Sequence, residues 1–574
     1  MKIELSANAM TILQARYLTR DEGGAVVETP EEMFRRVARA VAAAERVFDR
    51  SEKSGEIEER FFELMASLKF LPNSPTLMNA GRELGQLSAC FVLPVEDNLA
   101  SIFETLKETA LIHQSGGGTG FSFSRVRPRN DLVATTSGIA SGPVSFMKIF
   151  NTATDVIKQG GTRRGANMGV LRADHPDIPE FVTVKRDPCA LQSFNLSVGV
   201  PDSFMEAVGK NAPFPLVSPR TGRAVREVMA RDLFDLMVEC AWESGEPGLL
   251  FLDRINRDNP TPALGPIECT NPCGEQPLLP YESCNLGSVN LVKTLRRGAS
   301  NWEIDWDDLG RTVDLAVRFL DDVIEVNHFP IPDIERMTRA TRKIGLGVMG
   351  FAHLLILMGI PYGSRESIAV ASELMRFVTD RSHAASRELA GRRGEFPAFG
   401  ESARAARGEK PMRNAVVTTI APTGTLSIIA NCSSGIEPLY ALSTTRVVAG
   451  DVELHEIDPV FRRVMHDRGA VFPDPPSCTG TPLEDGPPLP DDLRGLFVTA
   501  LVIPPVQHVK MQAAFQDHTD NAVSKTINFP SHLSASEMKE TLVLAHELGC
   551  KGITIYRDQS RAGQVLRCGL GKAC

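Results

Sequence analysis

Apolar residues recur at helical spacing near the start of the chain, directly after a recognisable helix start. Thr29 can cap this helix, Pro30 suits its first position, and Glu32 completes a capping box. A second segment, 57–69, also places its apolar residues on one face of a helix. We therefore predict a helical N-terminal region over residues 1–65.

From residue 66 to 560, helical periods alternate with short apolar runs, which is typical of an α/β domain. A proline-rich, aspartate-rich and glycine-rich stretch at 471–496 predicts a surface loop, and residues 561–574 predict a flexible tail that carries cysteines. The predicted helices lie near 99–114, 142–158, 231–244, 308–326, 366–390 and 536–548, and the predicted strands near 167–171, 194–200, 288–291 and 552–556.

Charge and hydropathy argue against two classes of partner. The 574 residues carry a formal net charge of -9 and a pI of about 5.8, so a basic surface for nucleic acid is not expected. No apolar run approaches the roughly 20 residues that span a bilayer. The opening residues also lack the apolar segment of a secretory signal. We expect neither a nucleic-acid partner nor a membrane.

The chain has eleven cysteines, an odd number spread along its length. A secreted disulfide framework is therefore not expected, and a reducing cytoplasm fits better. Most of these cysteines are expected to be plain buried thiols, so the question is which few carry chemistry.

The run Asn-Pro-Cys-Gly-Glu-Gln at 271–276 is the most informative stretch. Proline and glycine bracket the cysteine and predict a loop. In an extended backbone Asn271, Cys273 and Glu275 share a face, which joins an amide, a thiol and a carboxylate. The amide can orient a hydroxyl, the carboxylate can take its proton, and the thiol can act as nucleophile or hydrogen-atom acceptor. On these six residues alone, a loop with an incidental cysteine is the more economical interpretation.

Two further cysteines stand in similar surroundings, Cys90 in Leu-Ser-Ala-Cys-Phe-Val and Cys284 in Glu-Ser-Cys-Asn-Leu-Gly-Ser-Val-Asn. Buried thiols at strand starts would explain both. Zinc explains them poorly, because neither has a cysteine or histidine partner at ligand spacing. We expect no metal bound by protein side chains.

Taken together, these motifs resemble the catalytic subunits of ribonucleotide reductases. The 271–276 run and the 282–290 segment resemble the family's active-site loop and next strand. Further matches follow in the family's order at 72–81, 115–120, 343–350, 421–427 and 511–526. The resemblance covers residues from about 5 to 565.

The resemblance implies a ten-stranded α/β barrel with the cysteine loop threaded through its centre. It implies that Cys273 becomes a thiyl radical that abstracts the 3′-hydrogen of the substrate. Glu275 would deprotonate the 3′-hydroxyl, and Asn271 would hydrogen-bond the sugar hydroxyls. Cys90 and Cys284 would supply a proton and two electrons as the 2′-hydroxyl leaves as water, and would end as a disulfide. Their Cα atoms must then lie within about 7 Å of each other.

The resemblance also implies substrate contacts. Ser74, Ala89 and Gly118 stand where family members touch the substrate, and Ala89 replaces a common serine, so a contact there would use its backbone. The loop 422–426 would hold the phosphates, because glycine allows close approach and a following helix start offers free N–H groups. By itself this loop would be an ordinary helix cap. Its residues are Pro422, Thr423, Gly424, Thr425 and Leu426.

Two arginine-bearing segments resemble the family's loops for specificity effectors, which are deoxynucleoside triphosphates and ATP. One holds Arg129 and the other Arg163 and Arg164. Arginines between glycines suit anion binding, although a solvated basic turn explains any single one equally well. The helices near 99–114 and 142–158 resemble the family's dimer interface, so we expect a homodimer.

The radical generator distinguishes the classes of this family. The chain has no Tyr-Tyr pair and no C-terminal glycyl-radical segment, which favours the class that uses adenosylcobalamin. It has no Asp-x-His-x-x-Gly motif, so histidine is not expected to ligate cobalt. Cys568 and Cys574 in the tail resemble the pair that re-reduces the active-site disulfide, although their spacing departs from the common Cys-x-x-Cys.

The expected activity is therefore reduction of ribonucleotides, with diphosphates favoured, to 2′-deoxyribonucleotides, with a thioredoxin-like or glutaredoxin-like reductant. Two rival interpretations stay open. One is a catalytic subunit of the di-metal class, which needs a radical-generating partner. The other is an inactive nucleotide-binding relative. The missing tyrosine pair argues against the first, and the retained cysteines argue against the second.

Overall fold

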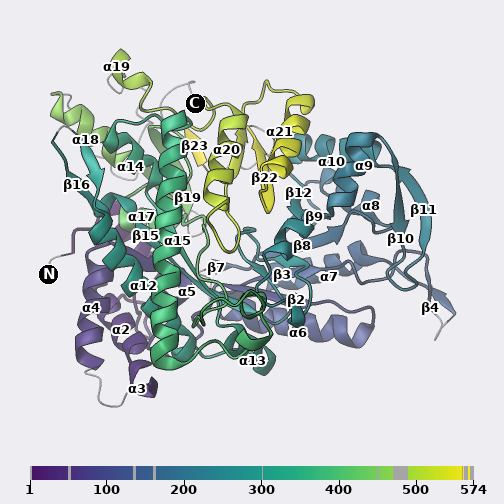
Figure 1. Cartoon of the computed structure of the whole chain (residues 1–574), viewed down its shortest axis with the longest axis horizontal. Helices are drawn as coiled ribbons and strands as arrows, with labels where there is room; N and C mark the ends of the chain where they lie inside the picture. Colours follow the sequence, from purple (N-terminus) through teal and green to yellow (C-terminus); the bar gives the residue numbers. More distant parts are fainter. Residues whose placement is uncertain are drawn as a thin grey trace.

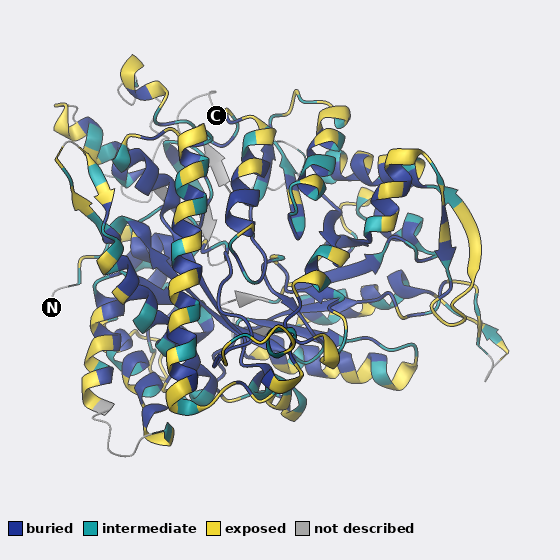
Figure 2. Cartoon of the chain, viewed as in Figure 1, coloured by how far each residue is buried: buried dark blue, intermediate teal, exposed yellow. Residues whose placement is uncertain are grey.

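The computed structural model describes residues 3–48, 54–133, 137–159, 163–299, 301–448, 452–469, 489–558, 560 and 566–568. Figure 1 shows a central sheet with helices packed around it, and Figure 2 shows that the sheet is buried while the outer helix faces are exposed.

The N-terminal region is helical, as predicted. Thr29 caps α2, and the capping box with Glu32 is present. The N-terminal helices include α2 and α4, which pack together in the lower left of Figure 1 and fully bury Phe34, Phe61 and Phe62. Their bounds are α1 Ala7–Arg16, α2 Pro30–Ala42, α3 Glu45–Phe48 and α4 Ser54–Ala66.

Ten strands form the central sheet, which confirms the predicted strand number and α/β class. The order is β1-β15-β2-β3-β8-β9-β12-β22-β21, with β18 on the other edge of β15. The strands are β1 Phe70–Pro72, β2 Cys90–Pro94, β3 Gly118–Ser122, β8 Asn167–Arg172, β9 Phe194–Val200, β12 Gly248–Phe251, β15 Ser283–Asn290, β18 Ile344–Met349, β21 Thr526–Phe529 and β22 Gly552–Arg557.

The sheet consists of two halves that run in opposite directions. Strands β2, β3, β8, β9 and β12 are mutually parallel. β15 is antiparallel to β2 and β22 is antiparallel to β12, while β18 and β21 follow β15 and β22 respectively.

Backbone hydrogen bonds link the two ends of this sheet. Leu346 N–H donates to Val417 O (2.8 Å), and Ile420 N–H donates to Ala522 O (3.2 Å). Residue 522 lies four residues before β21, so the 416–420 segment connects β18 to the chain that leads into the far edge strand and closes the barrel.

Helices surround the barrel, and the long helix α15 crosses its front in Figure 1. All the helices predicted in this part are present within a few residues. The bounds are α5 Ser74–Asn79, α6 Leu99–Gln114, α7 Pro143–Val156, α8 Ile178–Thr183, α9 Asp202–Lys210, α10 Ala230–Ser244, α11 Leu252–Arg257, α12 Trp306–Val326, α13 Pro332–Thr341, α14 Phe351–Met358, α15 Arg365–Arg393, α16 Ala403–Ala406, α17 Leu426–Ala430, α18 Pro459–Asp467, α19 Asp491–Arg494, α20 Pro505–Gln516 and α21 Ala535–Glu547. Among the described residues no helix is long and apolar enough to cross a membrane.

Small sheets decorate the barrel. The hairpin of β10 (Pro213–Val217) and β11 (Ala224–Met229) extends to the right in Figure 1. β19 (Ser443–Val448) pairs with β20 (Val452–Ile457) and with β23 (Leu566–Cys568). Short pairs are β4 Leu132–Val133 with β5 Gly138–Ile139, β6 Lys158–Gln159 with β7 Arg163–Arg164, β13 Cys269–Thr270 with β14 Pro277–Leu278, and β16 Leu295–Arg297 with β17 Trp302–Ile304.

Three sequence predictions need correction. The strand predicted at 288–291 begins five residues earlier, at Ser283. All eight of its residues are buried, so no apolar-polar alternation marks its start. The predicted 471–496 loop contains α19, while its residues 471–488 lie outside the described part. The tail predicted to be flexible contains β23, which uses the free edge of β19.

Candidate active site

A short hairpin carries the central cysteine. Cys269 lies opposite Leu278 in the pairing of β13 with β14, and we call residues 269–278 the cysteine hairpin. At its tip, Gly274 N–H donates to Asn271 O (3.1 Å), and Gly274 adopts a φ of +84°. This turn leaves Cys273 exposed, so its thiol is open to a substrate.

Glycines in β3 let the barrel wall approach one side of the hairpin closely. A Cβ on Gly120 would lie 1.8 Å from Thr270 O, and one on Gly118 would lie 3.0 Å from the Pro272 ring. From β9, Asn195 Nδ2 donates to Pro272 O (2.8 Å). The parallel half of the barrel thus fixes the first half of the turn.

The opposite wall fixes the second half. Glu275 O accepts hydrogen bonds from Thr419 Oγ1 (2.8 Å) and from Ala522 N–H (3.0 Å). Asn521 Nδ2 donates to Gln276 Oε1 (2.9 Å). Held from both sides, the hairpin crosses the interior of the barrel, as the family resemblance implies.

Cys90 and Cys284 lie opposite each other on neighbouring strands. They are Cα partners in the antiparallel pairing of β2 with β15, and both are buried. Antiparallel partners have Cα atoms about 4.5 to 5.5 Å apart, within the range that a disulfide needs. We call these two residues the thiol pair.

The hairpin residues gather around the thiol pair. Asn271 Nδ2 donates to Cys90 Sγ (3.1 Å). Burial raises the pKa of Cys90 well above its ordinary value, and the nearby charges of Glu275, Cys284 and Cys273 raise it further. The five residues predicted to be catalytic therefore lie in one place, with Glu275 itself buried.

The predicted substrate residues border this centre. Ser74 begins α5, and its Oγ lies 2.7 Å from Tyr17 Oη, which comes from the N-terminal region. Both backbone polar groups of Ala89 are hydrogen-bonded within the sheet. Its N–H donates to Cys284 O (3.2 Å), and its carbonyl accepts from Gly118 N–H (2.9 Å).

The 422–426 loop precedes α17. Thr423 adopts a φ of +53°, and its Oγ1 accepts a hydrogen bond from Gly435 N–H (2.7 Å). Thr423 O accepts from Ser427 N–H (2.8 Å), while Gly424 is exposed. The hydroxyl of Thr423 thus shapes the loop, and the glycine forms its open edge.

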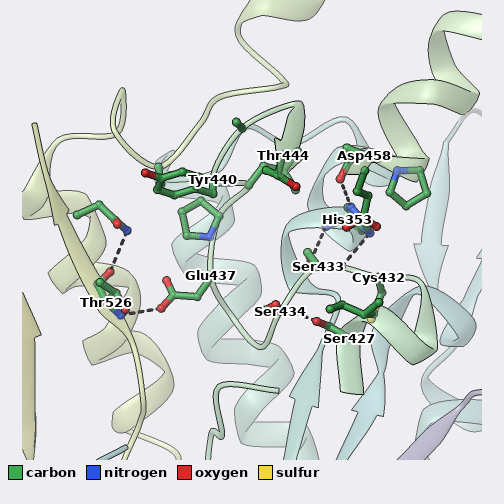
Figure 3. A pocket seen from close by; sticks show the side chains of 18 of the residues that line it. His353, Ser427, Cys432, Ser433, Ser434, Glu437, Tyr440, Thr444, Asp458 and Thr526 are labelled. Atoms are coloured by element: carbon green, nitrogen blue, oxygen red, sulfur yellow. Dashed lines mark hydrogen bonds and ion pairs between the residues drawn. The ribbon is translucent and has the colours of Figure 1, made fainter. Parts of the chain in front are cut away.

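A cavity of about 370 Å³ lies beside this loop (Figure 3). Ser427 and Ile428 of α17 form part of its wall, and Thr526 and Tyr556 form another part. Thr526 is four residues beyond Ala522, which holds the cysteine hairpin. The cavity therefore adjoins the phosphate-loop candidate, and the chain segment that forms another part of its wall also contacts the hairpin through Ala522.

Polar groups in the cavity are fixed by hydrogen bonds. Ser433 N–H donates to His353 Nδ1 (3.1 Å), so the proton of the imidazole is on Nε2, which donates to Asp458 Oδ2 (2.6 Å). Both ring nitrogens of His353 are thus engaged. Glu437 accepts hydrogen bonds from Lys525 Nζ (2.7 Å) and Thr526 N–H (2.6 Å).

The predicted effector and tail residues do not join this centre. Arg129 is largely exposed and pairs with Glu180 (3.4 Å). Arg163 and Arg164 form β7, opposite β6. Cys568 is the Cα partner of Thr444, and Cys574 lies outside the described residues.

Sequence reasoning missed several residues that shape the site, among them Tyr17, Lys343 and the His353–Asp458 pair. Lys343 Nζ lies 2.7 Å from Glu282 Oε2, and both side chains are almost fully buried. Lys343 belongs to a recognised motif, but its partner is 61 residues away in the chain, so sequence spacing gave no signal.

A barrel with a central cysteine hairpin and a facing thiol pair is suited to a dithiol-dependent reductase, and the comparison with known proteins agrees with a reductase. Residues 88–556 match the family described as "Ribonucleotide reductase, barrel domain", and residues 3–85 match "Ribonucleotide reductase, all-alpha domain". The chain belongs to the ribonucleotide reductase family.

Several curated relatives share nearly the whole chain. It is 48% identical to the vitamin B12-dependent ribonucleoside-diphosphate reductase of Thermoplasma acidophilum, over 99% of this chain and 81% of the relative. It is 50% identical to a protein with the same name in Mycobacterium tuberculosis, over 98% of this chain and 81% of the relative. A vitamin B12-dependent ribonucleotide reductase of Streptomyces coelicolor is 32% identical over 86% of this chain and 58% of the relative.

Proposed function

We propose that this protein reduces ribonucleoside diphosphates to 2′-deoxyribonucleoside diphosphates with adenosylcobalamin as cofactor. One observation carries the proposal: the exposed Cys273 sits on a hairpin fixed beside the directly opposed Cys90 and Cys284. The names of the relatives at 48% and 50% identity support the substrate class and the cofactor.

Each group then has a chemical task. Cys273, as a thiyl radical, takes the 3′-hydrogen atom, and Glu275 takes the proton of the 3′-hydroxyl. Asn271, which already donates to Cys90 Sγ (3.1 Å), can orient the sugar hydroxyls. The thiol pair gives one proton to the departing 2′-hydroxyl, gives its second proton and two electrons to the sugar at C2′, and closes as a disulfide. Cys273 then returns the hydrogen atom to C3′, and Glu275 returns its proton to the 3′-oxygen.

The substrate phosphates are assigned to the loop of Pro422, Thr423, Gly424, Thr425 and Leu426. Gly424 at the open edge allows close approach of an anion. Ser74 at the start of α5, whose Oγ lies 2.7 Å from Tyr17 Oη, offers a hydroxyl group. Ala89 and Gly118 would line the sugar by van der Waals contact of their backbone, because the N–H and carbonyl of Ala89 and the N–H of Gly118 are hydrogen-bonded in the sheet.

At about 370 Å³ the cavity in Figure 3 is smaller than adenosylcobalamin, so it would receive only a part of the cofactor, such as the adenosyl group, between its apolar walls and its few fixed polar groups. When bound, adenosylcobalamin supplies a 5′-deoxyadenosyl radical. Tyr440, Tyr556 and Glu437 would contact the cofactor. His353 would contact the cofactor only through the carbon atoms of its ring, because both ring nitrogens are hydrogen-bonded to Ser433 and Asp458.

A homodimer is proposed from the surface of α6 and α7. Five large apolar side chains on these two adjoining helices are exposed, and such patches commonly mark interfaces. A second copy of the chain would cover them, with effector deoxynucleotides or ATP binding beside Arg129, Arg163 and Arg164. The side chains are Leu99 (63% exposed), Phe103 (50%), Leu111 (40%), Ile149 (38%) and Val156 (77%).

The reductant is proposed to be a thioredoxin-like or glutaredoxin-like protein in the cytoplasm. It would act through the tail cysteines Cys568 and Cys574, whose dithiol can exchange with the disulfide of the thiol pair.

Optical spectroscopy tests the radical step. The protein is mixed anaerobically with adenosylcobalamin, CDP and a deoxynucleotide effector, and cobalt(II) absorption is followed. We expect cobalt(II) to form with the unmodified protein and to be lost in Cys273→Ala. The Cys189→Ala variant, which removes another exposed thiol, is the control. Equal cobalt(II) signals with and without Cys273 would contradict the proposal.

A further inference from the structure

Lys343 lies in one row with the thiol pair. β18 runs parallel to β15 with Ile344 opposite Asn285, and continuing this register by one residue places Lys343 beside Cys284. Cys90 is the partner of Cys284 on the other edge of β15. Three adjacent strands thus present a thiol, a thiol and an ammonium group at the same level.

All three side chains face the barrel interior. Paired residues on neighbouring strands share a face of the sheet, and so do residues two apart on one strand. Gly345, two residues beyond Lys343, faces the cysteine hairpin: a Cβ there would lie 2.8 Å from Gln276 Nε2. Lys343 therefore points toward the hairpin side of the sheet, as Cys284 does.

The charge of Lys343 is held in place by Glu282. Lys343 Nζ lies 2.7 Å from Glu282 Oε2, and the side chains are 1% and 0% exposed. The same oxygen accepts a hydrogen bond from Leu279 N–H (2.7 Å). A buried ammonium group needs such a partner, and the partner fixes where its charge acts.

The two sulfurs of the thiol pair meet different electrostatic surroundings. Burial raises the pKa of both thiols. The charge of Lys343 lowers the pKa of Cys284, and this effect is larger than the rise caused by Glu282 alone or by Glu275 alone. Cys90 has no cation among its main influences: Glu275 raises its pKa, and only the hydrogen bond from Asn271 lowers it. Among the main influences on the two thiols, a cation therefore acts only at Cys284, and Lys343 favours a negative charge on that sulfur.

We propose that Lys343 is a positioning residue that sets the direction in which the oxidised thiol pair is reopened. The reductant sulfur attacks Cys90, and Cys284 leaves as the thiolate beside Lys343. This inference rests on the proposed function, because it takes the Cys90–Cys284 disulfide as the product of turnover. It deepens that function by assigning separate roles to the two sulfurs.

The exchange balances with a dithiol as reductant. One reductant thiol loses its proton to solvent, and its thiolate forms a bond to Cys90 Sγ. The Cys90–Cys284 bond breaks, and its electron pair stays on Cys284 Sγ. The second reductant thiol then attacks the first, its proton passes to the released Cys90 thiolate, and the reductant becomes a disulfide. Cys284 takes a proton from solvent, so both cysteines end as thiols.

Trapping the mixed disulfide tests this direction. The full chain is oxidised with diamide, treated briefly with 2-mercaptoethanol, quenched with acid and alkylated with N-ethylmaleimide. Peptide mass spectrometry then counts mercaptoethanol adducts on Cys90 and on Cys284. We expect about tenfold more adduct on Cys90, since a lower leaving-thiol pKa speeds departure.

Charge-neutral variants show whether Lys343 causes the preference. Lys343→Met alone would leave Glu282 buried without its partner, so the main variant is Lys343→Met combined with Glu282→Gln. It should lose most of the preference for Cys90, whereas Lys343→Arg should retain it. The control is Lys69→Met with Asp308→Asn, which removes a lysine-aspartate pair (2.7 Å) beside the other end of β15.

The outcomes separate this inference from the proposed function. Adducts mainly on Cys284 in the unmodified chain, or an unchanged preference in the neutral double variant, would overturn the role of Lys343 alone. Failure of diamide to form the Cys90–Cys284 disulfide would overturn both proposals. Diamide acts without cofactor or nucleotide, so a chain that fails to reduce CDP still gives a clear answer here.

Discussion

Cys90 on β2 lies directly opposite Cys284 on β15, although 193 residues lie between the two in the sequence. The antiparallel register fixes their spacing without any local motif. The contacts that hold the cysteine hairpin place Asn271 Nδ2 3.1 Å from Cys90 Sγ. The site is therefore a product of strand pairing, and its chemistry depends on keeping that pairing intact.

Replacing either member of the thiol pair should stop repeated turnover. Cys90→Ser or Cys284→Ser leaves a single thiol, which cannot form the disulfide that supplies two electrons. With dithiothreitol as reductant, product should stay at or below one equivalent per active site. The Cys240→Ala variant, which alters a buried cysteine in α10, should turn over repeatedly. Many turnovers by either serine variant would remove the thiol pair from the reaction.

A methyl group on Gly120 should displace the cysteine hairpin from its position against β3. The added Cβ would lie 1.8 Å from Thr270 O, and backbone on both sides leaves little room for adjustment. We expect Gly120→Ala to lower the free energy of unfolding by about 3 kcal/mol and to abolish CDP reduction. Gly209→Ala in α9 is the control, because a Cβ there meets no atom within 4 Å. Full activity of Gly120→Ala would contradict the close packing of hairpin and strand.

His508 should make the protein less stable as the pH falls. Its Nε2 donates to Ala500 O (2.9 Å), while burial and the nearby charge of Lys525 lower its pKa to about 3. The unfolded chain, with an ordinary histidine pKa of about 6.5, binds the proton more readily between these values. Stability is therefore full above pH 6.5 and falls as the pH drops, by roughly 2 kcal/mol from pH 7 to 5.

Urea unfolding at several pH values measures this effect. His508→Gln can keep a donor toward Ala500 and should flatten the stability curve between pH 7 and 5. His466→Gln, at a histidine whose side chain is 81% exposed, should leave the curve unchanged. A curve for His508→Gln as steep as that of the unmodified protein would rule out His508 as the source.

A charge at the centre of the α6 surface should dissociate the proposed dimer. Phe103 is 50% exposed on this helix, and Phe103→Asp would place a carboxylate in the apolar contact. Light scattering after size-exclusion chromatography should show a monomer. Val27→Asp, at an apolar residue 57% exposed in the N-terminal region, should remain dimeric. An undisturbed dimer in Phe103→Asp would place the interface elsewhere.

Three of the predicted site residues could be grouped from the sequence because they occur in one contiguous motif. Asn271, Cys273 and Glu275 lie within five positions and share the tip of one hairpin. Helix positions were also predictable, because capping residues such as Thr29 and Glu32 act locally. The start of β15 was missed, since a strand buried on both faces shows no alternation.

Residues that act through tertiary contacts gave no such signal. Lys343 reaches Glu282 and His353 reaches Asp458 only after folding, across 61 and 105 positions. Tyr17 meets Ser74 from the separate N-terminal helices. Nothing in the local pattern of these side chains distinguishes them from others of their type. Their partners become apparent only when the barrel closes.

The central claim is the reaction together with its cofactor, and an anaerobic assay of CDP reduction tests it most directly. The protein is incubated with CDP, dithiothreitol and a deoxynucleotide effector, with and without adenosylcobalamin, and no second protein is added. We predict dCDP only when adenosylcobalamin is present. Absence of dCDP under both conditions, or dCDP formation without the cofactor, would contradict the account.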